Sequence, residues 1–210
     1  MRRQNRITPF GRIVAPPADT AARGDWFGNR GCIHDPAGRI VRQWRLRAWL
    51  ICRLEFKGRR RALMQPGRYT ELFFLDEATA FAAGHRPCGE CRWHDYQRFR
   101  ACWPGLHGHT VDAVDAVLHR ERTAGDRRRA RLDGLPDGSF VALDAAPDTA
   151  WLKWGGVLYP WSLDGYGAPL AYRREAAATV LTPPSLVAAL ARGYPIGVHA
   201  SGPSPHVTQD

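Results

Sequence analysis

The chain of 210 residues lacks any apolar run of the length that a membrane-spanning helix needs. Its basic N-terminus, MRRQNRITPFGR, is not followed by the apolar segment of a secretory signal. Phosphate-binding P-loops, the Gly-x-Gly-x-x-Gly fingerprint, the serine nucleophile elbow and the His-Glu-x-x-His motif are also missing. These absences exclude several enzyme classes and predict a cytoplasmic protein that does not span a membrane.

The number of cysteines is odd. The five residues are Cys32, Cys52, Cys88, Cys91 and Cys102. An odd count without a secretory signal argues against a disulfide framework and favours a reducing compartment. In such a compartment a close cysteine pair is typical of a metal site or a redox site.

Lysine is nearly absent, because arginine outnumbers it 28 to 2. The formal net charge is +10, and residues 1–131 hold 26 basic against 13 acidic side chains. Residues 132–210 hold 4 basic and 7 acidic side chains, so the positive charge belongs to the first two thirds of the chain. A field of this sign attracts polyanions, which predicts a nucleic-acid partner, DNA in the first place. A GC-rich genome would also produce the arginine bias.

The first part of the chain predicts α+β structure. Residues 45–56, RLRAWLICRLEF, alternate so that Leu46, Cys52 and Leu54 share an apolar face with other hydrophobic residues, which predicts a half-buried strand. The segments RRRALM (59–64) and YTELFF (69–74) follow across two glycine-containing turns. Together the three segments predict an antiparallel meander.

Helices are predicted after this meander. Asp76 precedes a short apolar run that Gly84 ends, and Thr110 precedes a second amphipathic stretch. Aromatic residues at three- and four-residue spacing predict a further helix over 90–102. Beyond residue 132, short apolar segments separated by turn residues predict a β-rich, small barrel-like region. It ends in a helix, SLVAALAR, that Ser185 or Thr182 starts and Gly193 ends.

The segment AAGHRPCGECR (82–92) carries the sharpest chemical signal. A Cys-x-x-Cys turn before a helix is a good zinc half-site, because backbone amides and the helix N-terminus favour the thiolates of Cys88 and Cys91. A thioredoxin-like redox pair has the same spacing, but it needs a preceding βαβ frame that this sequence does not show.

Residues 73–91, FFLDEATAFAAGHRPCGEC, resemble the end of the metal-binding domain of Ada-type DNA-repair proteins. The similarity covers residues 70–92. The resemblance implies zinc ligation by Cys88 and Cys91 and a DNA-facing role for Arg86. In that family the first half-site holds two closely spaced cysteines, whereas Cys52 stands alone here.

Two more zinc ligands are expected, since closed structural sites use four. Cys32 and His34 are the preferred pair, because their glycine-flanked loop can fold around an ion. Cys52 is the rival, although its alternation places it on the apolar face, where a free cysteine is usually a core residue. His94 is a third candidate.

These patterns predict a zinc-stabilised α+β fold in four parts. They are an irregular basic arm (1–25), a zinc-binding Ada-like α+β domain (26–131), a β-rich region ending in a helix (132–200) and a disordered tail (201–210).

The leading functional prediction is a zinc-containing DNA-binding protein of repair or regulation, with a structural Zn²⁺ and an arginine-rich face on the phosphates. The predicted contact residues are Arg30, Arg59, Arg60, Arg61, Arg86 and Arg92. Alternatives are a metal-dependent, nuclease-like hydrolase or a DNA alkyl acceptor, in which His34 and Asp35 or an exposed cysteine would do the chemistry. The third hypothesis is an interaction module whose charge only keeps it soluble.

Overall fold

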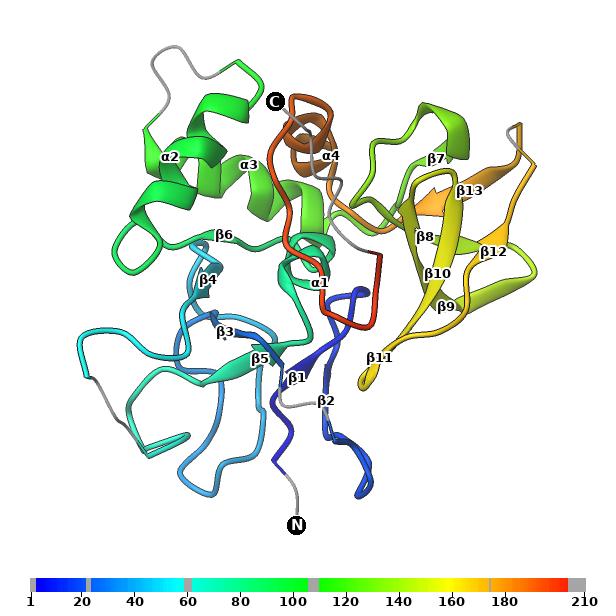
Figure 1. Cartoon of the computed structure of the whole chain (residues 1–210). Coiled ribbons are helices and arrows are strands. Elements are labelled where there is room, and N and C mark those ends of the chain that lie inside the picture. Colours follow the sequence, from blue (N-terminus) through cyan, green and yellow to red (C-terminus); the bar gives the residue numbers. More distant parts are fainter. Residues whose placement is uncertain (1–2, 22–23, 59–61, 106–109, 174, 204–210) are drawn as a thin grey trace.

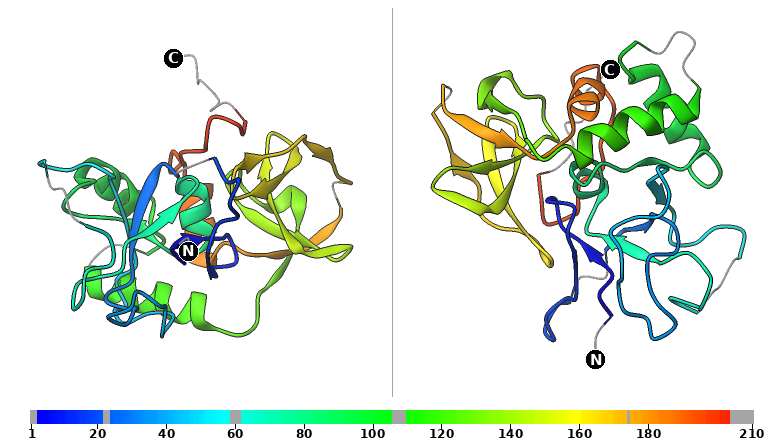
Figure 2. Two further views of the ribbon diagram at one scale, coloured as in Figure 1. Left: turned by 90° about the horizontal axis from the view of Figure 1, so that it is seen from below. Right: turned by 180° about the vertical axis from the view of Figure 1, so that it is seen from behind.

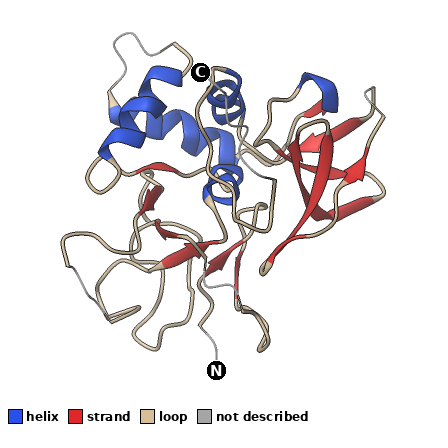
Figure 3. Ribbon diagram, in the orientation of Figure 1, coloured by secondary structure: helices blue, strands red, loops and turns tan. Residues whose placement is uncertain are grey.

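A computed structural model describes residues 3–21, 24–58, 62–105, 110–173 and 175–203. Over these ranges the protein is a mixed α and β structure with four α-helices and two β-sheets (Figure 1, Figure 3). None of the helices in the described ranges is both long and apolar enough to cross a membrane.

The first sheet has the strand order β2-β1-β5-β3-β4-β6. Its strands are β1 (Arg6–Ile7), β2 (Ile13–Val14), β3 (Trp26–Asn29), β4 (Leu50–Cys52), β5 (Leu72–Phe74) and β6 (Arg86–Pro87). The β1–β5 and β4–β6 pairs are parallel, and the other pairs are antiparallel. Because β3 lies between β4 and β5, the predicted meander of consecutive strands does not form. The sequence does not predict β3, because residues 26–38 are rich in turn-forming residues.

The predicted irregular arm is part of this sheet. β1 and β2 pair with each other, and β1 continues the sheet onto β5. Ile7 and Ile13 are buried in the hydrophobic core. Strands of two residues are too short to show alternation, so the sequence pattern could not reveal them.

The strand predicted over 45–56 is shorter and faces the other way. Only β4 is extended and paired, and the buried residues around it are Trp49 and Ile51, at 5% and 0% exposure. Leu46 and Leu54, on the predicted core face, are 49% and 51% exposed. Around β4, Trp49 and Ile51 alternate with Leu50 and Cys52, so both faces carry apolar residues and alternation alone could not select the buried face. Cys52 therefore points away from the core that Ile51 joins.

All four predicted helices form, although the second begins at Trp93 instead of near residue 90. They are α1 (Glu77–Ala82), α2 (Trp93–Cys102), α3 (Val111–Thr123) and α4 (Pro184–Ala191). Asp76 caps α1 by accepting a hydrogen bond from the Thr79 amide at 2.7 Å, and Thr110 caps α3 through the Ala113 amide. Gly84 follows α1 with φ +81°, a conformation that favours glycine.

The second sheet has the order β11-β10-β9-β8-β13-β7, with β12 paired to β10. Its strands are β7 (Arg129–Arg131), β8 (Phe140–Leu143), β9 (Ala146–Trp154), β10 (Val157–Ser162), β11 (Gly165–Tyr166), β12 (Leu170–Ala171) and β13 (Ala177–Val180). A short 3-10 helix, Leu132–Gly134, follows β7. β7 and β11 lie at opposite ends of the strand order, so the predicted barrel does not close. β7, assigned from sequence to the first domain, pairs with β13 of this sheet.

One hydrophobic core joins the two predicted domains. It includes Leu72 of the first sheet, Phe81 of α1 and Leu152 of the second sheet. α1 lies between the sheets and contacts β5 and β8 (Figure 2).

Beyond α4 the chain returns to α1, where the Tyr194 hydroxyl donates to Glu77 at 2.8 Å. The predicted tail begins in ordered structure, because Ser201 Oγ accepts from the backbone of β11 at 3.0 Å; residues 204–210 lie outside the described ranges.

Candidate metal centre

Three cysteine thiols gather beside the end of β4. Cys52 is the last residue of β4, Cys88 directly follows β6, and Cys91 lies in the turn before α2. Their sulfur atoms all lie within 4.8 Å of one another. Over the residues that the structure describes, this is the one group of three or more His, Cys, Asp or Glu ligand atoms at such spacing.

The parallel pairing of β4 with β6 brings these cysteines together. Ile51 is in register with Pro87, so the residues that follow them, Cys52 and Cys88, emerge side by side. The Cys88 amide donates to the Ile51 carbonyl at 3.0 Å and extends this ladder. A turn closed by the Arg92 amide on the Cys88 carbonyl, at 3.1 Å, then brings Cys91 back to the other two thiols.

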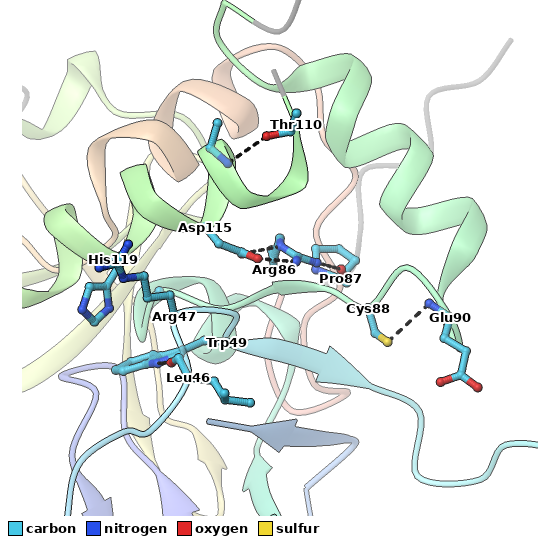
Figure 4. A network of polar contacts seen from close by, with 12 residues as sticks. Leu46, Arg47, Trp49, Arg86, Pro87, Cys88, Glu90, Thr110, Asp115 and His119 are labelled. Atoms are coloured by element: carbon cyan, nitrogen blue, oxygen red, sulfur yellow. Dashed lines mark hydrogen bonds and ion pairs between the residues drawn. The ribbon is translucent and has the colours of Figure 1, made fainter. Parts of the chain in front are cut away.

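Backbone amides surround the sulfurs with positive potential. The Glu90 amide donates to Cys88 Sγ at 3.4 Å (Figure 4), and the Arg53 amide donates to Cys91 Sγ at 3.4 Å. Hydrogen bonding from Cys52, followed by that from Cys91, lowers the pKa of Cys88 to about 2. The same contact with Cys88 raises the pKa of Cys52. The cluster therefore favours a thiolate at Cys88, which is the form that a thiophilic cation binds.

The three cysteines form part of the wall of a cavity of about 390 Å³. Aromatic rings of Phe27 and Tyr69 line it, and their centroids lie 5.7 Å apart. Arg53 and Glu71 add polar groups to the lining. The three cysteines would therefore hold an ion at the edge of this space.

Cys32 and His34 lie elsewhere and do not join the cluster. His34 Nδ1 lies 2.6 Å from Thr70 Oγ1, and its Nε2 lies 3.3 Å from the Gln65 carbonyl oxygen. The thiol of Cys32 donates to the His34 carbonyl at 3.8 Å. The structure thus assembles the rival ligand Cys52 in place of the predicted pair, because the loop of Cys32 and His34 packs against Thr70.

Two other sequence candidates, and the fifth cysteine, are also apart from the cluster. His94 is exposed on α2. Asp35, considered as a partner of His34 in catalysis, pairs instead with Arg39 at 2.7 Å. Cys102 donates to the Arg192 carbonyl at 3.5 Å at the end of α2.

Three of the predicted DNA-contacting arginines are buried within the fold. Arg30, Arg86 and Arg92 are 1%, 4% and 3% exposed. Arg86 pairs with Asp115 through two contacts of 2.7 Å, which join β6 to α3 (Figure 4). Arg92 pairs with Glu77 at 2.6 Å. Their burial corrects the predicted surface role, since carboxylates distant in sequence draw Arg86 and Arg92 inward. Arg59, Arg60 and Arg61 lie outside the described residues.

The sequence favours Cys32 and His34 over Cys52 as ligands because the alternation of residues 45–56 places Cys52 on the predicted core face, and the structure shows that the opposite face is buried. The signal that favours Cys52 is the pair of large apolar residues, Trp49 and Ile51, at the opposite parity of the same segment. With these two residues in the core, Cys52 must face outward.

Comparison of the chain with family models, with curated proteins and with solved structures gave no match. The fold and the cluster define a mixed α and β protein with a three-cysteine candidate metal centre. The similarity of residues 70–92 to Ada-type domains remains a resemblance.

Proposed function

We propose that the protein binds one zinc ion through Cys52, Cys88 and Cys91 and that it acts on nucleic acid. The observation that supports zinc is the approach of three sulfur atoms to within 4.8 Å on a cavity wall. Thiolates select zinc, Cu(I) or iron–sulfur clusters, and the tetrahedral preference of zinc accommodates three sulfurs and one further ligand.

The fourth coordination position distinguishes the candidate activities. Structural zinc sites are closed by four protein ligands, whereas reactive sites keep one position for water or substrate. Among the described residues only three thiols converge, beside a cavity of about 390 Å³. This arrangement favours a reactive centre, in which zinc would supply Lewis acidity toward a group in the cavity and hold the cysteines as thiolates. The hydrolase and alkyl-acceptor alternatives gain support from it over a purely structural zinc.

The charge of the first 131 residues supports a nucleic-acid partner. Since Arg30, Arg86 and Arg92 are buried, exposed arginines must make the phosphate contacts. Exposed arginines stand at 42, 45 and 47, in a loop that also exposes Trp44. Aromatic and arginine side chains side by side can stack on unpaired bases and contact phosphates.

Cobalt substitution tests the metal ligands directly. The Co²⁺-loaded protein should show sulfur-to-cobalt charge transfer, and Cys52→Ser should lose the contribution of one thiolate or lose the metal. His34→Ala should leave the spectrum and the bound cobalt unchanged, because His34 hydrogen-bonds to Thr70 and lies outside the cluster. An unchanged Cys52→Ser spectrum, or purified protein without metal after expression in zinc-supplemented medium, would show the assignment to be wrong.

Nucleic-acid binding is expected to be salt-dependent and largely independent of sequence. On duplex DNA the log–log slope of affinity against salt should be about −0.9 for each phosphate neutralised. Replacing Arg42, Arg45 and Arg47 together by alanine should reduce this slope by about one unit for each lost contact. The matched control replaces Arg129, Arg131 and Arg173, exposed arginines of the second sheet and its loops. Equal weakening by both triple variants, or no binding at low salt, would contradict this interface.

A further inference from the structure

A second cavity, of about 520 Å³, lies where the end of α3, the β13–α4 connection and the loop before β4 meet. It shares no lining residue with the cavity beside the cysteines. Its walls combine apolar groups, among them Trp44, Leu181 and Pro183, with several charged side chains. Its volume suits a small-molecule ligand or one nucleotide unit.

The charged groups of this cleft are mainly cationic. Four arginines line it: Arg30, Arg122, Arg127 and Arg128. The two carboxylates in the lining are Glu121 and Asp126. Glu121 is already engaged, because its two oxygens accept from the Ser185 amide at 3.1 Å and from the Ser185 hydroxyl at 2.6 Å. The cleft therefore has an excess of positive charge.

Arg30 is buried in this cleft among neutral partners. Its guanidinium donates to the carbonyls of Gly11 and Gln43, at 3.2 Å and 3.5 Å, and to His85 Nε2 at 3.2 Å. Burial, then the nearby Arg30 charge, lowers the pKa of His85 well below its usual value, so the imidazole is neutral. Over the described ranges no carboxylate forms an ion pair with Arg30.

Arg122 lies beside Arg30 and adds a second partly buried cation. Both guanidinium carbons lie over the Trp49 ring, at 3.7 Å for Arg30 and 4.0 Å for Arg122. Arg122 donates to the carbonyls of Gly84, at 2.9 Å, and of Arg47. Arg47 and Trp49 lie close to α3 in Figure 4. Burial lowers the pKa of Arg122 to about 9, an effect only partly offset by Asp115, which is engaged with Arg86.

Arg127 is a third arginine in the lining of this cleft. It donates to the Phe10 carbonyl at 3.0 Å, and burial followed by repulsion from Arg12 lowers its pKa. Buried charges in proteins are normally paired, because an isolated charge loses its hydration without compensation. Arg30 is fully buried and Arg122 is partly buried, while Arg127 and Arg128 are exposed beside them. Two buried guanidinium groups without a carboxylate partner in the described ranges, next to two exposed ones in the same cleft, favour an anion from outside the described chain.

We infer that this cleft binds a phosphate-bearing ligand of the nucleotide class. The phosphate is held by Arg122, Arg127 and Arg128, and the base lies against Trp44, while the buried Arg30 adds positive potential from behind. Arginine suits this role because its planar fork matches phosphate oxygens. The inference is independent of the zinc centre, since the two cavities share no residues. The phosphate can belong to a free nucleotide or to the end of a nucleic-acid strand.

Titration calorimetry on the full chain tests the inference with adenosine monophosphate, adenosine, inorganic phosphate, and a short single-stranded DNA with or without a 5′-phosphate. Adenosine monophosphate or the 5′-phosphorylated strand should bind at least about tenfold more tightly than its unphosphorylated counterpart. Preference for the mononucleotide identifies a free nucleotide as the ligand, and preference for the phosphorylated strand identifies a nucleic-acid end. Equal binding with and without the phosphate would overturn the inference.

The double variant Arg127→Gln and Arg128→Gln should weaken binding of the preferred phosphate ligand by about tenfold or more, because two charged donors are lost. Arg98→Gln, an exposed arginine of α2, is the matched control and should leave this affinity unchanged. Unchanged affinity in the double variant would also overturn the inference. Zinc content, measured on the same samples, should stay the same, so failure of this site is distinguishable from failure of the metal centre.

Discussion

Replacing Cys88 with serine is expected to abolish stoichiometric zinc binding and to lower the free energy of unfolding of the zinc-loaded protein by about 4 kcal/mol. This figure is the stabilisation that a ligand gives at about a thousand times its dissociation constant. Cys88 is central to the cluster, because it is the thiol that hydrogen bonds from Cys52 and Cys91 favour as a thiolate. Denaturant unfolding, with zinc measured on the same samples, gives both quantities.

Cys102→Ser is the matched control for this experiment. Cys102 lies outside the cluster, and a serine hydroxyl can replace its thiol as a donor to the Arg192 carbonyl. This variant should keep its zinc and lose little stability. A strong chelator should destabilise the wild-type protein to the level of Cys88→Ser and should leave Cys88→Ser itself unaffected. A wild-type melting temperature that does not change with chelator would contradict the coupling of metal to fold.

Replacing Asp115 with alanine is expected to destabilise the protein by about 3–5 kcal/mol, the usual cost of removing one partner from a buried ion pair. Both side chains of the Arg86–Asp115 pair are almost fully buried, and two contacts of 2.7 Å join them (Figure 4). Loss of the carboxylate leaves the Arg86 guanidinium buried with one carbonyl partner, that of Pro87. Thermal or urea unfolding measures the loss.

Asp112→Ala is the matched control, because Asp112 is an exposed carboxylate in the first turn of the same helix. Its removal should cost at most about 1 kcal/mol, through the helix dipole. The double variant Arg86→Met with Asp115→Leu should regain much of the lost stability, because no charge is then left unpaired. Equal losses in Asp115→Ala and Asp112→Ala would show that the buried pair contributes nothing.

Asp115→Ala also distinguishes between two possible roles of Arg86. If Arg86 only joins β6 to α3, Asp115→Ala should lower stability and leave nucleic-acid affinity of the folded protein unchanged. Weaker binding by the folded variant, at temperatures where both proteins are native, would return Arg86 to the interface that the Ada-type resemblance implies. The burial of its side chain favours the first outcome.

The sequence by itself determined the features that depend on neighbouring residues. Asp76 and Thr110 begin their helices as predicted, because a capping side chain bonds an amide three residues ahead. The spacing of Cys88 and Cys91 likewise brings two thiols together within a single turn. The location of the positive charge in the first 131 residues also follows from composition alone.

The tertiary structure alone decided which third cysteine joins that pair and how deep the arginines lie. Cys52 reaches Cys88 only because β4 and β6 pair in parallel, a contact that spans 36 residues of sequence and leaves no local pattern. Arg86 is buried because Asp115, from a helix 29 residues away, provides its charge partner. A strand with apolar residues on both faces does not specify which face is buried until the sheet and helices around it are placed, and that placement turned Cys52 toward the cavity and not toward the core.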